Sequence, residues 1–217
     1  LKPVNLQLIE EMLLERFNAK IATDNLEADD FLSIDSYAAW KDWSKTKHQK
    51  DRLIVITEDK DALQCGGSHL FNPTKMTLPF TIKNELGEVS LREDTKAKTL
   101  TGWGRKFLYA QMLLGDSVDN YSPTFLVDKG NPHKRFGDVS CFNLLNKLNT
   151  DEECLRAIVE QYKLWYPTPV TFASHDGGEY TYSWLSVADE IWHLARMKRY
   201  VEDDVSFSDV LSKLDII

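Results

Sequence analysis

Seven carboxylate side chains gather at three places along the sequence, in a pattern suited to binding divalent metal ions. Mg²⁺ prefers oxygen ligands in octahedral geometry and keeps several waters, so a few rigidly held carboxylates are enough to bind it. Two such ions about 4 Å apart can activate a water and stabilise the leaving oxygen of a phosphodiester. We therefore predict a site for two Mg²⁺ or Mn²⁺ ions. The clusters are Glu27, Asp29 and Asp30; Asp59 and Asp61; and Asp116 and Asp119.

Each cluster taken alone has a simpler explanation. Asp and Glu are favoured in the first turn of a helix, where the macrodipole and free N–H groups attract negative charge, and this would explain the first cluster. The second and third clusters could serve as turn and cap residues after a strand and a helix. However, seven unpaired carboxylates brought together would repel one another strongly. Their joint occurrence favours a metal site over three separate caps.

The predicted elements place the clusters at their ends. The first cluster opens a helix over 28–43. The second directly follows Leu53–Ile56, a β-branched segment typical of a buried parallel strand, at the edge where ligands bind in open α/β sheets. The third follows a helix over 100–114 that ends at Gly115.

Hydrophobic periodicity and turn residues predict the other elements. A turn over 84–87 would join two short strands into a hairpin. Thr150 and Glu153 form a capping box, and Asp138 and Ser183 are suited to cap helices. We predict helices over 2–17, 138–148, 150–165, 184–200 and 207–214, one helical turn over 62–64, strands over 19–22, 69–71, 76–82 and 89–92, and an irregular loop over 121–135.

Composition sets the class of protein. With 217 residues, 42% hydrophobic content and six Trp, the chain can bury a sizeable core, and no apolar run is long enough to span a membrane. Its three cysteines lack C-x-x-C spacing, which suggests reduced thiols in the cytoplasm. The composition shift near Tyr121 predicts an α/β metal-binding region over 1–120 and a helical DNA-binding region over 121–217.

The net charge of −8 would ordinarily argue against a nucleic-acid partner. Two bound divalent ions would change it to −4, and the basic residues are bunched. One group lies in the irregular loop, where we expect it to contact phosphates unless it is only a solvated face. This group is Lys129, His133, Lys134 and Arg135.

The acidic motifs together resemble those of the 5′→3′ exonuclease and flap endonuclease family, in the form found in bacteriophage exonucleases and the nuclease domains of bacterial DNA polymerases. The stretches that carry the resemblance are Glu27-Ala28-Asp29-Asp30, Thr57-Glu58-Asp59-Lys60-Asp61 and Leu114-Gly115-Asp116-Ser117-Val118-Asp119-Asn120. The resemblance implies a two-metal phosphodiesterase on a mostly parallel central sheet flanked by helices. It implies that Glu27, Asp29 and Asp30 hold or support one ion and that Asp59, Asp61, Asp116 and Asp119 hold the other, with Asp29, Asp30, Asp59 and Asp61 as catalytic residues.

The chain departs from the family pattern in two places. The family begins with a strand carrying another metal-binding Asp, followed by an arch that clamps a 5′ single strand. Because the chain starts at Leu1 rather than Met, we expect this part to lie upstream or in a second polypeptide. The family also has a helix–turn–helix that grips duplex DNA, often with a monovalent cation such as K⁺. Here 121–135 replaces its first part and 136–140 resembles its second half, so we expect a degenerate version.

The sequence thus favours a Mg²⁺-dependent 5′ nuclease, of phage or bacterial origin, that acts on DNA in replication or recombination. We expect its substrates to be 5′ ends, flaps or RNA/DNA hybrids, in the cytoplasm, or in the host cytoplasm for a phage protein. The alternative is a non-catalytic DNA-binding or interaction subunit of a split or incomplete nuclease. A phosphatase of the D-x-D type fits poorly, because its nucleophilic Asp would lie on the first strand.

Overall fold

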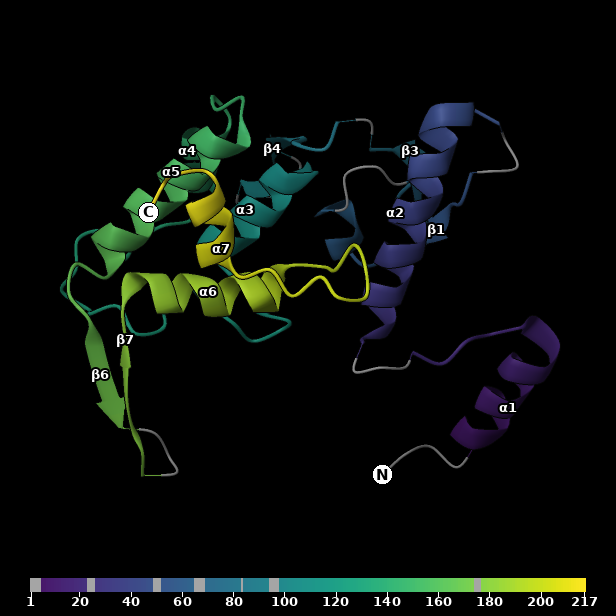
Figure 1. The fold of residues 1–217 in the computed structure, drawn as a ribbon, viewed down its shortest axis with the longest axis horizontal. Coiled ribbons are helices and arrows are strands. Elements are labelled where there is room, and N and C mark those ends of the chain that lie inside the picture. The colour runs from purple at the N-terminus through teal and green to yellow at the C-terminus, as the bar shows by residue number, and fades with distance from the viewer. Residues whose placement is uncertain are drawn as a thin grey trace.

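The computed structural model of the protein describes residues 5–22, 26–48, 52–64, 69–82, 84–93, 98–173 and 177–217. The architecture is mixed α/β, with small sheets beside a larger helical part (Figure 1). Among these residues, no helix combines the length and apolar character needed to cross a membrane. In chain order the elements are α1 (Leu6–Phe17), α2 (Ala28–Thr46), β1 (Val55–Ile56), the 3₁₀ helix η2 (Asp61–Gln64), β2 (His69–Phe71), β3 (Phe80–Thr81), β4 (Glu88–Arg92), β5 (Thr99–Trp103), α3 (Arg105–Leu114), α4 (Asp138–Leu145), α5 (Asp151–Trp165), β6 (Val170–Ala173), β7 (Glu179–Tyr182), α6 (Trp184–Ala195) and α7 (Phe207–Lys213).

The described strands form three small sheets. The largest has the order β1-β2-β3, in which β1 and β2 are parallel and β2 and β3 are antiparallel. The pairs β4–β5 and β6–β7 are both antiparallel. The predicted α/β class is therefore confirmed, whereas the described residues do not show a mostly parallel central sheet.

Helix α3 lies at the centre of the hydrophobic core. Eight of its ten residues are buried, as expected of a helix surrounded by other elements. Helices α4, α5 and α6 pack against it, and α7 packs against α6. The core includes residues on both sides of position 120, and the boundary placed there from composition stays a prediction.

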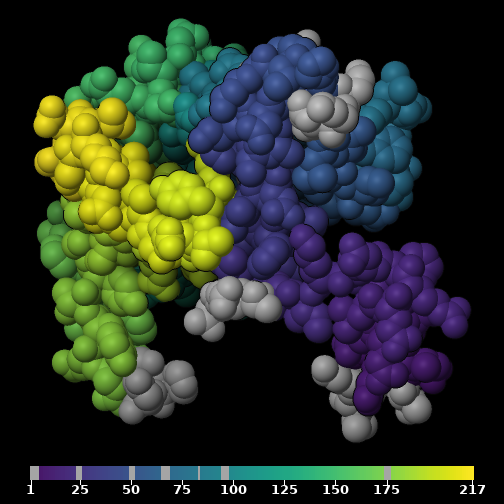
Figure 2. All heavy atoms as spheres, turned by 45° about the vertical axis from the view of Figure 1, so that its right-hand side comes forward, coloured from purple at the N-terminus to yellow at the C-terminus, as the bar shows by residue number. Residues whose placement is uncertain are grey.

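Helix α2 and the β1–β2–β3 sheet lie to one side of the helical part (Figure 1). Helix α1 projects from this side and has no buried residue, and Figure 2 shows it standing out below α2 and the sheet. Leu26, just before α2, is buried and anchors the start of that helix. In the first turn of α2, Asp30 accepts a hydrogen bond from the backbone N–H of Lys198, so this end of α2 contacts the segment after α6.

The prediction of one helix over 100–114 was wrong in its first half. Residues 99–103 form β5, which pairs with β4 along its whole length, and only Arg105–Leu114 is helical. Gly104 has φ of +73° and separates the two elements. At Gly102 a Cβ atom would lie 2.6 Å from the carbonyl oxygen of Glu88, so the close approach of β4 requires glycine there.

Two other predictions of strands and hairpins differ from the structure, and one hairpin has no counterpart among the predictions. Residues 19–22 form no strand with any of the described segments, and the backbone N–H of Ala19 instead donates to the carbonyl oxygen of Leu13 at 3.2 Å. The strands over 76–82 and 89–92 do not pair with each other: β3 pairs with β2, and β4 pairs with β5. The β6–β7 hairpin was not predicted. Each of these features depends on pairing with another segment of the chain, which local sequence patterns do not predict.

Several local predictions were confirmed, with shifted ends. Helix α2, the helical turn η2, the capping box of Thr150 and Glu153, and the irregular loop over 121–135 are all present. Asp138 is the first residue of α4 rather than its N-cap, which is Gly137; its carboxylate accepts a hydrogen bond from the backbone N–H of Leu100 at 2.6 Å. Helix α6 ends at Ala195 instead of continuing to residue 200.

The placement of the hydrophobic core can be tested by two substitutions on α5. Ile158 is fully buried, so Ile158→Ala should lower the free energy of unfolding by about 3 kcal/mol through lost burial and a residual cavity. Leu164 lies on the same helix and is 44% exposed, so Leu164→Ala is the matched control and should change the free energy by about 0.5 kcal/mol or less. Urea unfolding measures both. Equal effects would contradict the placement of the core.

Candidate metal centre

Asp61, Asp116 and Asp119 meet in the structure. Each offers a carboxylate oxygen, and these oxygens all lie within 4.8 Å of one another. Asp61 begins η2 after strand β1, whereas Asp116 and Asp119 follow the end of α3. Two segments separated by more than fifty residues therefore contribute to one acidic cluster. Asp116 is buried, Asp61 is half-buried and Asp119 is exposed, so the cluster opens to solvent on one side.

The backbone after α3 fixes the position of Asp116. Gly115 has φ of +75°, and a Cβ atom there would lie 2.5 Å from the carbonyl oxygen of Tyr121. The backbones of Asp116 and Tyr121 exchange two hydrogen bonds of 3.0 Å each, and the N–H of Val118 donates to Asp116 Oδ1 at 2.8 Å. This tight turn holds Oδ1 of Asp116 in place, while its Oδ2 contacts Lys60.

Lys60 supplies a positive charge within the cluster. Its Nζ atom contacts Asp116 Oδ2 and lies 4.0 Å from Asp61 Oδ1. Burial raises the pKa of Asp116, but the hydrogen bonds from Lys60 and from backbone N–H groups outweigh burial, and the net pKa is lowered. Asp116 is therefore ionised at neutral pH and available as a ligand.

Asp61 behaves differently from Asp116. Burial, together with the charges of Asp59 and Asp116, raises its pKa to about 6, although the hydrogen bond from Gln111 and the charge of Lys60 act in the opposite direction. Gln111 Nε2 donates to Asp61 Oδ1 at 2.5 Å. The metal-free cluster thus carries a carboxylate that is costly to ionise, and a bound cation would relieve this cost.

Asp59 and Asp29 form a second acidic group beside the first. Asp59 Oδ1 accepts a hydrogen bond from the backbone N–H of Asp61 at 2.9 Å, which ties the two aspartates of the loop together. Asp29 and Asp59 line the same small pocket between α2 and β1. The pKa of Asp29 is raised by burial and then by Asp59, Asp30 and Asp119. Asp29 therefore lies near Asp59, and its role as a metal ligand stays a prediction.

Glu27 and Asp30 lie outside the three-carboxylate cluster. Glu27 is the exposed N-cap residue of α2 and makes no side-chain capping hydrogen bond. Asp30 Oδ1 accepts a hydrogen bond from the backbone N–H of Lys198 at 2.9 Å. Asp29 and Asp30 also lie in the first turn of α2, where the helix dipole favours negative charge. The simpler explanation for the first cluster therefore holds in part.

The predicted DNA-binding residues lie on the loop between α3 and α4. Lys129, His133 and Arg135 are exposed, so their side chains are accessible to a phosphate backbone. Lys134 is half-buried and donates from Nζ to the carbonyl oxygen of Val127 at 2.6 Å, which gives it a structural role in the loop. Three of the four residues thus remain available for contacts.

The chain was compared with family models, curated proteins and solved structures. No family model, curated protein or solved structure matches it. A function must therefore be inferred from the acidic motifs and from how the fold arranges them.

The donor set fits a hard divalent cation, because every candidate ligand is a carboxylate oxygen. Tyr121 adds a second observation. Its side chain is buried, and its hydroxyl has no hydrogen-bond partner among the described residues. Burial, followed by the charges of Asp61, Asp116 and Asp119, raises the pKa of Tyr121, whose backbone is paired with that of Asp116. A buried hydroxyl without a partner is costly, and a hydrated cation nearby would supply one.

Sequence reasoning missed Tyr121, Gln64 and Gln111. Tyr121 directly follows the third motif, and a polar aromatic residue next to two candidate ligands is a detectable signal. Gln64 and Gln111 are buried amides, 4% and 5% exposed. A glutamine within an apolar helix, as at position 111, is a signal for a buried hydrogen bond but does not identify its partner.

Proposed function

We propose that the protein is a metal-dependent 5′→3′ exonuclease or flap endonuclease that hydrolyses DNA phosphodiester bonds. The observation that carries the proposal is the meeting of Asp61, Asp116 and Asp119 within 4.8 Å of one another, beside the Asp29 and Asp59 pair. Two neighbouring groups of carboxylates suit a two-metal site. The order of the acidic motifs adds the resemblance to 5′ nucleases.

In this proposal Asp61, Asp116 and Asp119 hold one Mg²⁺ or Mn²⁺ ion, and Asp29 with Asp59 holds a second. When bound, such ions activate a water and stabilise the leaving oxygen. Asp30 secures the start of α2 through the N–H of Lys198, and Glu27 lies exposed beside the site. Lys60 offsets part of the repulsion among the carboxylates and offers a charged donor for a phosphate oxygen.

The partners follow from the same proposal. DNA with 5′ ends or flaps, or an RNA/DNA hybrid, would contact the exposed Lys129, His133 and Arg135 through its phosphates. A mostly parallel sheet, a degenerate helix–turn–helix in the helical region over 121–217, a cytoplasmic setting, and a second polypeptide that completes the site remain parts of the proposal. The sheet, the helix–turn–helix and the second polypeptide rest on the motif resemblance, whereas the cytoplasmic setting rests on the cysteines and the bounds of the helical region on composition.

The test is cleavage of a 5′-flap DNA by the full-length protein. We expect Mg²⁺-dependent cleavage that EDTA abolishes and that Asp59→Ala lowers by about 100-fold, since a direct ligand should cost at least as much as an outer-sphere partner. Asp42→Ala is the matched control, because Asp42 is an exposed α2 carboxylate paired only with Lys45 among the described residues. This control should cleave like the wild type.

Two results would contradict the nuclease proposal: no Mg²⁺-dependent cleavage by the wild type, or full activity of Asp59→Ala. Binding of flap DNA without cleavage would instead favour the non-catalytic subunit. A fluorescence anisotropy titration with the same DNA, carried out in the presence of Mg²⁺, separates these outcomes.

A further inference from the structure

A chain of buried amide hydrogen bonds leads from Asp61 to the end of α6. Gln111 Nε2 donates to Asp61 Oδ1 at 2.5 Å, and Gln64 Nε2 donates to Gln111 Oε1 at 2.6 Å. Gln64 Nε2 also donates to the carbonyl oxygen of Ala195 at 2.6 Å, while the backbone N–H of Met197 donates to Gln64 Oε1 at 3.3 Å. We refer to Gln111 and Gln64 as the amide relay.

The backbone at the end of α6 sets the direction of the amide relay. A carbonyl oxygen only accepts and a backbone N–H only donates, so Ala195 and Met197 together fix which end of the Gln64 amide is the NH₂ group. The Gln64 NH₂ group must then face the Gln111 oxygen. The remaining end of Gln111, its NH₂ group, is therefore directed at Asp61, which accepts as a carboxylate.

The same backbone segment also holds the first acidic motif. The N–H of Lys198 donates to Asp30 Oδ1 at 2.9 Å. Residues 195–198 therefore contact Asp30 directly and Asp61 through the amide relay. These two aspartates lie on α2 and η2, which are far apart in sequence from α6.

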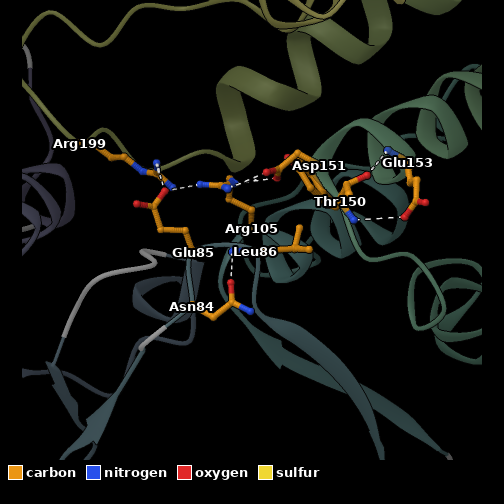
Figure 3. A network of polar contacts seen from close by, with 9 residues as sticks. Asn84, Glu85, Leu86, Arg105, Thr150, Asp151, Glu153 and Arg199 are labelled. Atoms are coloured by element: carbon orange, nitrogen blue, oxygen red, sulfur yellow. Dashed lines mark hydrogen bonds and ion pairs between the residues drawn. The ribbon is translucent and has the colours of Figure 1, made fainter.

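A polar network anchors this segment to the helical core. Arg199 lies 3.8 Å from Glu85, which accepts a hydrogen bond from Arg105 at 2.5 Å, and Arg105 in turn binds Asp151 at the start of α5 (Figure 3). The N–H of Arg199 also donates to Asp203 Oδ2 at 2.9 Å. The segment after α6 is thus fixed on both sides, as a positioning element requires.

We propose that residues 195–198 and the amide relay position Asp61 and Asp30 for metal binding, with Gln111 as the positioning residue that directs the Asp61 carboxylate toward Asp116 and Asp119. This inference rests on the proposed function. Buried amides are costly unless they are hydrogen-bonded. Here the two amides bond to each other, and their other contacts are to backbone groups or to a candidate ligand. Partners that orient metal ligands typically affect metal affinity without touching the ion.

The test is Mn²⁺ affinity, measured by the loss of the electron paramagnetic resonance signal of free Mn²⁺. Gln111→Met keeps the length and burial of the side chain but removes the donor to Asp61 and the acceptor for Gln64. We expect it to weaken Mn²⁺ binding by about tenfold. Tyr162→Phe is the matched control: it also removes one buried hydrogen bond to α3, from Tyr162 to the carbonyl oxygen of Met112, and should leave Mn²⁺ affinity unchanged.

A double-mutant cycle separates positioning from a general loss of structure. In an Asp61→Asn background, Gln111→Met should weaken the remaining Mn²⁺ binding by less than about twofold, because its effect acts through Asp61. If Gln111→Met weakens Mn²⁺ binding tenfold in both backgrounds, or not at all in the wild-type background, the positioning role of the amide relay is wrong. The proposed metal site is unaffected by either result. Failure of the wild-type protein to bind Mn²⁺ would overturn the proposed function and this inference with it.

Discussion

Asp61→Asn is expected to weaken Mn²⁺ binding by about 100-fold and, at the same time, to make the metal-free protein more stable at neutral pH. The loss of affinity follows because Asp61 supplies one of three clustered carboxylate oxygens. The gain in stability follows because burial, Asp59 and Asp116 make the ionised form of Asp61 unfavourable. Asparagine keeps the shape of the side chain and its acceptor for Gln111 but carries no charge.

The sign of the stability effect follows from the raised pKa of Asp61. Its pKa is about 6 in the folded protein and 3.8 as the ordinary value, so the folded state binds the proton more tightly than the unfolded chain. This contribution to stability is fully present below the ordinary pKa and is lost as the pH rises through about 6. At pH 7 we expect Asp61→Asn to raise the free energy of unfolding by roughly 1–2 kcal/mol.

Urea unfolding between pH 4 and pH 8, in EDTA, measures the difference between the two proteins. The difference should grow as the pH rises toward about 6 and then remain constant. Asp42→Asn is the control, since Asp42 is exposed and should change neither stability nor Mn²⁺ affinity appreciably. Unchanged Mn²⁺ binding in Asp61→Asn would argue against Asp61 as a ligand, whatever the stability shows.

The elements with local signals were predictable from the sequence. The capping box of Thr150 and Glu153 marks the start of α5, and both of its hydrogen bonds form. The acidic first turn of α2 and the helical turn after Asp59 were equally local. Strand β5 was not predictable in this way, because residues 99–103 share an apolar pattern with the following helix. Their strand conformation comes from pairing with Glu88–Arg92, and the glycine at 102 permits that pairing.

The sequence singles out the three carboxylates that meet in the structure but not the residues that support them. Asp61, Asp116 and Asp119 were singled out because each follows an element, and the structure brings them together. Sequence position alone could not separate these three from Glu27 and Asp30, whose place depends on how α2 packs. The amide relay depends on backbone groups 131 residues beyond Gln64. No local pattern reports such a contact.

Arg105→Met should cause the largest loss of stability outside the apolar core. Arg105 donates from Nε and Nη2 to the two oxygens of Asp151 at 2.7 and 2.6 Å, and from Nη1 to Glu85 at 2.5 Å (Figure 3). Tyr109 also donates to Asp151 at 2.7 Å. Removing the guanidinium leaves both carboxylates without their main partner. Because these groups remain 24–38% exposed, we expect a loss of about 2 kcal/mol rather than the full cost of a buried pair.

The dependence of the free energy of unfolding on pH below 7 tests whether the lost Arg105–Asp151 contact destabilises Arg105→Met. Burial raises the pKa of Asp151, but the hydrogen bonds from Arg105 and Tyr109 outweigh burial, and the net pKa is lowered. Asp151 therefore stabilises the wild type above the ordinary pKa of 3.8, and this contribution is lost as the pH falls through the lower folded-state value. The difference between wild type and Arg105→Met in urea unfolding should accordingly shrink on going from pH 7 to the most acidic pH at which both proteins fold.

Arg156→Met is the matched control for Arg105→Met. Arg156 pairs with Glu152 on the same helix at 2.9 Å, but both side chains are at least half exposed, so its loss should cost about 0.5 kcal/mol or less. Equal losses for the two arginine variants would mean that the Figure 3 network adds no more than a surface ion pair. Since Arg199 reaches this network through Glu85, a destabilised Arg105→Met protein should also bind Mn²⁺ more weakly than Arg156→Met. That comparison links the fold of the helical core to the geometry of the acidic cluster.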